Sequence, residues 1–62
     1  MTPELDCKLR TYELGDGLTT EERDAILSEI NLHTSRPLSF FREESDDDLV
    51  MSYHVFVIGP NA

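Results

Sequence analysis

The chain has 62 residues, 39% hydrophobic and 29% charged, with a single cysteine and no tryptophan. Thirteen Asp and Glu against five Lys and Arg give a net charge of −8 with His neutral. These counts exclude a multi-domain enzyme, a disulfide scaffold and a transmembrane protein, and they predict one small domain over residues 1–62.

The first predicted element is a half-buried strand over residues 4–13. Leu5, Cys7 and Leu9 alternate with charged residues, and a period of two is typical of a strand with one buried face. This pattern predicts that the Cys7 thiol is a buried core group, because thiols often fill apolar space. The following Gly15-Asp16-Gly17 indicates a turn.

A helix is predicted from Thr19 to about His33. Thr19 and Glu22 have the spacing of a capping box. Pro37 disfavours helical backbone at the residue before it, so the helix is expected to end near His33. The apolar stripe at helical spacing consists of Ile26, Leu27 and Ile30.

Two further strands are predicted, over residues 38–43 and 49–58, joined by a polar hairpin loop at 43–48. The element order is then β-α-β-β, an α+β fold. The third strand is the longest and is apolar on both faces, which is typical of a central strand. We therefore predict a three-stranded antiparallel sheet of order 1-3-2, with the helix packed on one face.

One helix covers only one face of such a sheet, so the other face is expected to be exposed. A contiguous exposed apolar patch usually marks an interaction site. An arrangement in which loops or side-chain stems cover this face remains open. The predicted face carries Tyr12, Phe41, Val50, Phe56 and Ile58.

The strongest local feature is a run of five carboxylates within residues 43–48, namely Glu43, Glu44, Asp46, Asp47 and Asp48. They are suited to contact Lys and Arg on a partner, or to imitate the charges of a nucleic-acid backbone. A solvated turn that only adds solubility is the alternative. The predicted partner-binding residues are these five together with Tyr12, Phe41, Phe56 and Ile58.

The net charge argues against direct binding of nucleic acid or of an anionic membrane surface. It favours a basic or nucleic-acid-binding protein as the partner. No cofactor or metal site is expected, because His33 and His54 are 21 positions apart with one thiol in the whole chain. A free thiol, and an N-terminal sequence without the features of a signal peptide, predict a cytoplasmic protein.

Catalysis is not predicted. His54 has no catalytic partner at a recognisable spacing, so a structural or interface role is favoured over a general base. The β-α-β-β order resembles the topology of the small oligomeric tautomerases, without a specific motif. That resemblance implies an N-terminal proline amine as the base, whereas Pro3 follows Met1 and Thr2 and has an amide nitrogen.

The sequence therefore predicts a small acidic binding module, an inhibitor that occludes a basic surface of its partner as a nucleic-acid mimic. Such small acidic domains are common among inhibitors encoded by viruses and mobile elements, which is an association only. The alternative is a homodimeric structural module that pairs through the exposed apolar face. An oligomeric enzyme of tautomerase-like topology is a distant third.

Overall fold

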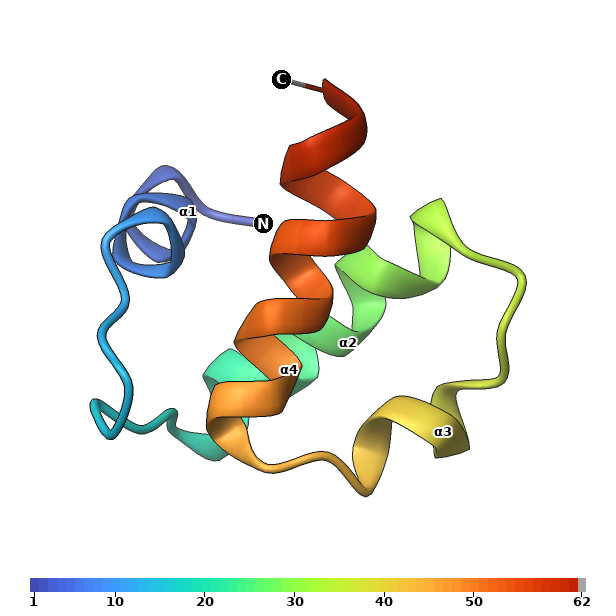
Figure 1. Ribbon diagram of the computed structural model, residues 1–62, viewed down its shortest axis with the longest axis horizontal. Coiled ribbons are helices and arrows are strands. Elements are labelled where there is room, and N and C mark those ends of the chain that lie inside the picture. Colours follow the sequence, from blue (N-terminus) through green and yellow to red (C-terminus); the bar gives the residue numbers. More distant parts are fainter. Residues whose placement is uncertain (62) are drawn as a thin grey trace.

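Helices account for all the regular structure of residues 1–61, which the computed structural model describes (Figure 1). The predicted α+β fold with a sheet of order 1-3-2 is wrong, because these residues contain no strand. The resemblance to the tautomerase topology is wrong for the same reason. The elements are α1 (Pro3–Arg10), α2 (Thr20–His33), α3 (Leu38–Arg42), α4 (Asp46–Tyr53), the π-helical η1 (His54–Ile58) and the 3-10 helix η2 (Gly59–Asn61).

The predicted helix is confirmed as α2, including both of its ends. The Thr19 hydroxyl accepts a hydrogen bond from the Glu22 N–H at 3.1 Å, and the Glu22 carboxylate accepts one from the Thr19 N–H at 2.8 Å. This reciprocal capping box satisfies two backbone donors at the start of the helix. Its apolar stripe, Ile26, Leu27 and Ile30, is buried.

Residues 4–13 form α1 and the beginning of a loop, so the strand predicted there is wrong. The Thr2 hydroxyl accepts a hydrogen bond from the Leu5 N–H at 3.2 Å, and a proline follows Thr2 in the first turn. Both features favour a helix start. Leu5 and Leu9 share one helical face, whereas Cys7 is exposed. The prediction of a buried Cys7 thiol is therefore also wrong.

The predicted second and third strands are helical as well. Residues 38–42 form α3, and the predicted hairpin loop contains the first turn of α4. The Ser45 hydroxyl accepts a hydrogen bond from the Asp48 N–H at 3.3 Å. A serine cap followed by three aspartates suits a helix N-terminus, where the backbone dipole favours negative charge. Residues 49–58 continue this helix as the rest of α4 and η1.

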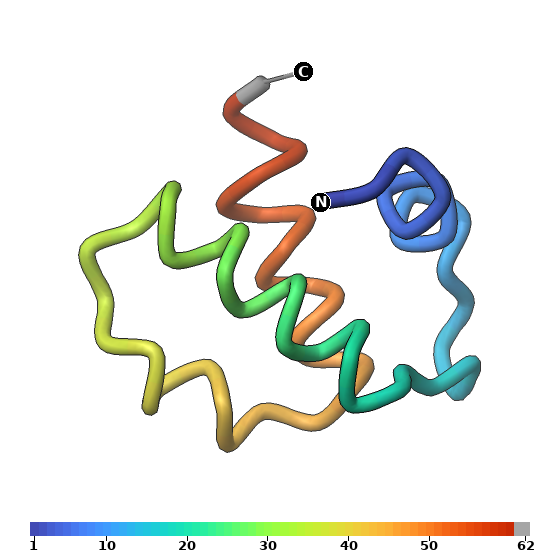
Figure 2. Tube along the Cα trace, turned by 180° about the vertical axis from the view of Figure 1, so that it is seen from behind, coloured from blue at the N-terminus to red at the C-terminus, as the bar shows by residue number. Residues whose placement is uncertain are grey.

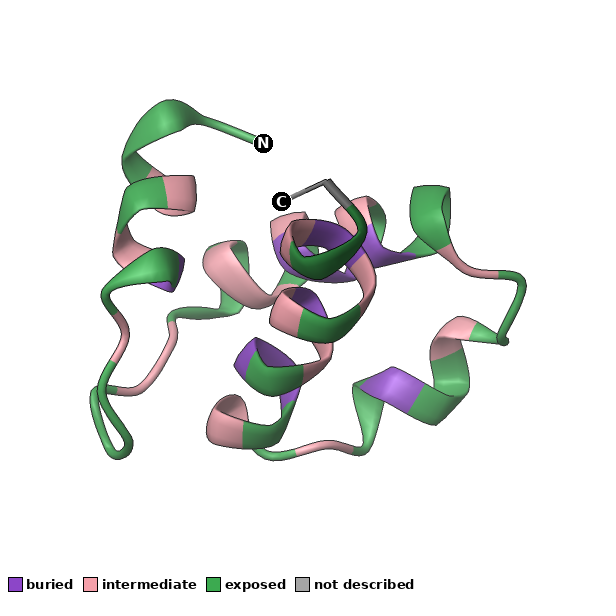
Figure 3. Ribbon diagram, turned by 45° about the horizontal axis from the view of Figure 1, so that its top comes forward, coloured by how far each residue is buried: buried purple, intermediate pink, exposed green. Residues whose placement is uncertain are grey.

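The core lies where α4 and η1 cross α2, with α1 and α3 on opposite sides of that pair (Figures 1 and 2). Figure 3 shows the buried segments facing the interior of this arrangement. Within residues 1–61, no helix has the length and apolar character needed to cross a membrane. The buried core side chains are Leu9, Ile26, Leu27, Ile30, Phe41, Leu49, Val50, Tyr53 and Val57.

The apolar sheet face predicted from the sequence does not exist in this fold. Phe41 and Val50 are buried in the core. Tyr12, Phe56 and Ile58 are half-buried and pack against it. These five side chains contribute to the stability of the domain rather than to one exposed face, because the helical backbone turns most of them inward.

Two polar contacts hold α1 against the continuous helix formed by α4 and η1. The Tyr53 hydroxyl donates a hydrogen bond to the Asp6 carboxylate at 2.7 Å. The Nε2 atom of His54 lies 2.7 Å from the carbonyl oxygen of Leu9 and donates to it. Because Leu9 is also fully buried, α1 is attached by both an apolar and a polar anchor.

Candidate functional site

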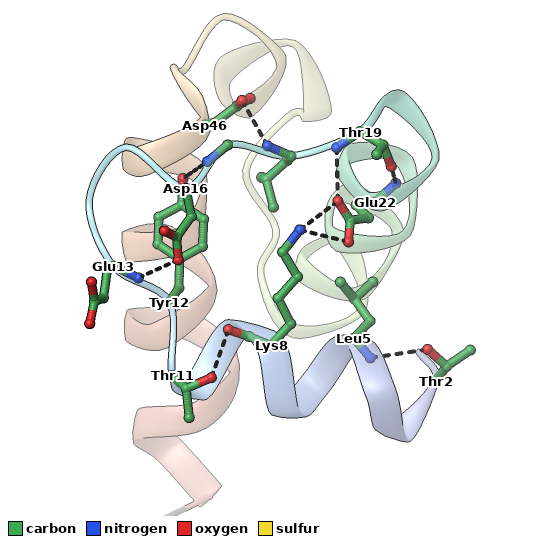
Figure 4. A network of polar contacts seen from close by, with 12 residues as sticks. Thr2, Leu5, Lys8, Thr11, Tyr12, Glu13, Asp16, Thr19, Glu22 and Asp46 are labelled. Atoms are coloured by element: carbon green, nitrogen blue, oxygen red, sulfur yellow. Dashed lines mark hydrogen bonds and ion pairs between the residues drawn. The ribbon is translucent and has the colours of Figure 1, made fainter.

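The loop that joins α1 to α2 folds back onto the N-terminus of α4. Gly15 and Gly17 have φ angles of +93° and +79°, in the left-handed region that favours glycine. The Asp16 carboxylate accepts a hydrogen bond from the Glu13 N–H at 2.9 Å, which closes the turn locally. Figure 4 shows this turn with the side chain of Glu13 directed away from the helices.

Asp47 fixes the tip of this loop, although it lies 32 positions from Gly15 in the sequence. Its carboxylate accepts hydrogen bonds from the Gly15 N–H at 3.0 Å and from the Tyr12 hydroxyl at 2.7 Å. The Tyr12 oxygen in turn accepts one from the Gly17 N–H at 3.0 Å. The loop is thus joined to the first turn of α4 by a connected polar network.

Asp46 joins the other end of the loop to the same turn. Its carboxylate accepts hydrogen bonds from the Leu18 N–H at 3.0 Å and from the Arg23 guanidinium at 2.6 Å. The second terminal nitrogen of Arg23 donates to the carbonyl of Glu44 at 2.9 Å. Arg23 therefore connects α2, the segment after α3, and α4 at one point.

We call the resulting surface the acidic end and define it as Glu13, Asp16, Asp46, Asp47 and Asp48. The N–H of Leu18 and then the Arg23 guanidinium hold the pKa of Asp46 below its usual value. The N–H of Gly15 and then the Tyr12 hydroxyl lower the pKa of Asp47 in the same way. Both carboxylates are consequently ionised at neutral pH.

Positive charge compensates little of the acidic end. Among the described residues, the side chains of Glu13 and Asp48 make no ion pair and no hydrogen bond, and both are exposed. Within residues 1–61, Arg23 forms the one ion pair at this end, with Asp46, and the charge of Lys8 also helps to lower the pKa of Asp46. Lys8 and Arg10 are paired elsewhere, with Glu22 and Asp6 at 2.9 and 2.8 Å. The guanidinium of Arg36 lies over aromatic rings, and no described ion pair involves Arg42.

The residues predicted as partner-binding are separated by the fold. Asp48 and Glu43 are exposed, whereas Glu44 is half-buried and accepts a hydrogen bond from the Ser52 hydroxyl at 2.8 Å. Asp46 and Asp47 also serve the internal network described above. The aromatic and aliphatic members lie in or against the core. The three aspartates therefore share the first turn of α4, and of the predicted aromatic residues Tyr12 contacts them, through Asp47.

Sequence reasoning missed Glu13 as a member of the site, and Asp16 was not among the predicted partner-binding residues. The Gly15-Asp16-Gly17 turn was visible, but nothing local indicates which distant segment it contacts. The usable signal was Ser45 followed by three aspartates, which is a helix start. Recognising it would have placed three carboxylates on a rigid helical turn in place of a hairpin loop.

The side chains considered for catalysis have other surroundings. Nε2 of His54 is engaged with the Leu9 carbonyl, and Pro3 lies in the first turn of α1. In the part of the chain that the structure describes, no three His, Cys, Asp or Glu side chains gather as a metal site would require.

Tyr53 provides a test of the contact between α1 and α4. Burial, followed by the hydrogen bond to Asp6, raises the pKa of Tyr53 to about 12. The pKa of a tyrosine in the unfolded chain is about 10. The contact of Tyr53 therefore contributes fully to stability below that pH, and its contribution is lost as the pH rises towards 12. We expect urea titrations to show a free energy of unfolding that falls over this range. The fall should shrink in Tyr53→Phe, and equal falls in both proteins would contradict the contact.

No protein-family model, curated protein or solved structure matches this chain. The fold and the site define a small helical domain with an acidic surface at the N-terminus of α4, where Arg23 pairs with Asp46.

Proposed function

We propose that this chain is a small, non-enzymatic binding module whose acidic end covers a basic, nucleic-acid-binding surface of a partner protein. One observation carries the proposal. The first turn of α4 carries three carboxylates, and the loop with Glu13 and Asp16 is bound to two of them, while Lys8 and Arg10 are paired with Glu22 and Asp6. A surface of this charge suits Lys and Arg that otherwise contact phosphates.

The acidic end is also pre-organised. The loop is fixed by hydrogen bonds from the N–H groups of Gly15 and Leu18 to Asp47 and Asp46. A fixed charge array loses less conformational entropy on binding than a free tail. It would steer a basic partner over long range, giving fast association that depends on salt.

The cellular setting and the origin of the protein belong to the same proposal. The lone Cys7 thiol is exposed on α1, and a free thiol is typical of a reducing compartment. We therefore place the interaction in the cytoplasm. We include in the proposal that the protein is an inhibitor encoded by a virus or mobile element. This part rests on the association with other small acidic domains, and no contact in the structure bears on it.

The test is capture of a partner by the immobilised chain at low and high salt, with matched charge variants. Asp48→Asn and Glu13→Gln remove exposed carboxylates that make no internal bond among the described residues. Asp24→Asn makes the same change on the exposed face of α2. Each acidic-end change alone should weaken binding of a basic protein about threefold at low salt, and the two combined roughly tenfold, whereas Asp24→Asn should weaken it less than about 1.5-fold.

The outcomes are distinct because all these variants keep the internal network. Captured protein should also be displaced by added nucleic acid, which would occupy the same basic surface. Equal losses for Asp48→Asn and Asp24→Asn would mean that only net charge matters. That result, or capture that ignores salt, would overturn the proposal.

A homodimer remains the second candidate, on a different surface from the one predicted. Met51 and Val55 lie one turn apart on α4 and η1 and are 58% and 59% exposed. Two such side chains make a small apolar strip for a second copy of the chain. Recovery of only this chain in the capture experiment, unaffected by salt, would favour that alternative.

A further inference from the structure

A cleft of about 400 Å³ lies between α1 and the first turns of α2, away from the acidic end. Figure 4 shows the side chains of Leu5 and Lys8 both pointing from α1 towards the start of α2. The bond between Lys8 and the Glu22 carboxylate, at 2.9 Å, bridges the two helices beside the cleft. This bridge links the two walls of the cleft.

The floor of the cleft is apolar. Leu5 is half-buried and packs against the core, and Ala25 faces it from α2. The aliphatic stem of Lys8 continues this surface while its ammonium group is held by Glu22. Because Ala25 has only a methyl group, the floor is left open at a size that suits one or two side chains.

The rim of the cleft is acidic and unpaired. Glu4 and Glu21 line it, and neither makes an ion pair or a side-chain hydrogen bond with the rest of the described chain. Lys8 is neutralised by Glu22, so the lining carries a net charge of −2 from three Glu and one Lys. Helix dipoles account for acids in these first turns, but not for an open apolar floor between them.

We propose that this cleft binds a short basic segment of a protein partner, with one apolar side chain on the floor. Lys or Arg on either side of that residue would lie against Glu4 and Glu21, with their stems along Leu5. The inference rests on the proposed function, since both require a basic partner. It adds a second contact, which selects partners that have an apolar residue between two basic ones. A purely electrostatic surface could not make that selection.

The test uses the full-length chain labelled with ¹⁵N and two synthetic peptides of equal charge. One carries leucine between lysines, and the other carries serine in place of leucine. The leucine peptide should shift the amide signals of Leu5, Lys8 and Ala25 saturably. It should bind about tenfold more tightly than the serine peptide, as expected for burial of one leucine side chain.

Variants separate the two parts of the cleft. Ala25→Leu fills the floor and should abolish the preference for the leucine peptide. Glu4→Gln combined with Glu21→Gln should weaken both peptides by about threefold, while Asp24→Asn, outside the cleft, should not. If Ala25→Leu loses its helical circular dichroism spectrum, the comparison of the two peptides on the unchanged chain still tests the floor, and the Glu4 and Glu21 variants test the rim.

The results also separate this inference from the proposed function. Equal affinity for the two peptides, with shifts confined to residues 13–18 and 46–48, would overturn the cleft while supporting the acidic end. Saturable shifts in the cleft, with no response at the acidic end to either peptide, would support the cleft and count against the proposed function. The absence of saturable binding would overturn the cleft.

Discussion

Replacing Phe41 by alanine is expected to lower the free energy of unfolding by about 3–5 kcal/mol, the usual cost of removing a buried phenyl ring. Phe41 is completely buried and contacts two neighbouring rings edge-on, with centroid distances of 5.2 Å to Phe40 and 5.7 Å to Phe56. A loss of this size is comparable with the whole stability of so short a chain. Urea unfolding followed by circular dichroism measures it.

Phe40→Ala is the matched control, because Phe40 is 54% exposed and stands next in the sequence. It should cost less than about 1 kcal/mol, as surface changes usually do. In the sheet predicted from the sequence, Phe40 would face the helix and Phe41 the other side, so the order of the two effects would reverse. Should Phe41→Ala fail to fold, Phe41→Leu replaces it, and Phe41→Leu should still be less stable than Phe40→Ala.

Leu9→Ala is expected to cost about 2–5 kcal/mol and to release α1 from the core. Leu9 is the fully buried side chain of α1, and its carbonyl accepts the hydrogen bond from His54. Urea unfolding gives the loss, and the amide signals of residues 3–10 should move towards random-coil positions.

Cys7 supplies the control for Leu9→Ala. Its side chain is exposed on the opposite side of α1, so Cys7→Ala should leave stability within about 0.5 kcal/mol. The folded protein should also react with a thiol reagent as fast as an unfolded thiol does. A strand over residues 4–13 would instead bury Cys7 beside Leu9, and protection of the thiol would contradict the helix.

The helix α2 could be predicted because both of its ends are encoded nearby. Thr19 and Glu22 form the capping box, and Pro37 follows the last turn closely. The apolar stripe between them fits a helical period and no other. Local signals thus agreed with one another, which is the condition under which a sequence predicts its own structure.

The segments 4–13 and 49–58 were misassigned because their patterns fit two periods. Leu5 and Leu9 are four residues apart, which suits one helical face as well as one strand face. In the second segment, Val50, Val55 and Val57 favour strands by intrinsic preference. Packing across α2 overrides that preference, and the buried Leu49, Tyr53 and Val57 then follow helical spacing.

The sequence by itself determined the net charge of −8, the extent of α2 and the concentration of carboxylates at residues 43–48. Only the tertiary structure decided what those carboxylates do. Asp46 and Asp47 accept hydrogen bonds from Leu18 and Gly15, which lie 28 and 32 positions away. Caps and helical periods act over one or two turns and can be read locally. The pairing of distant segments depends on which apolar faces meet in the core, and no short stretch of sequence encodes that.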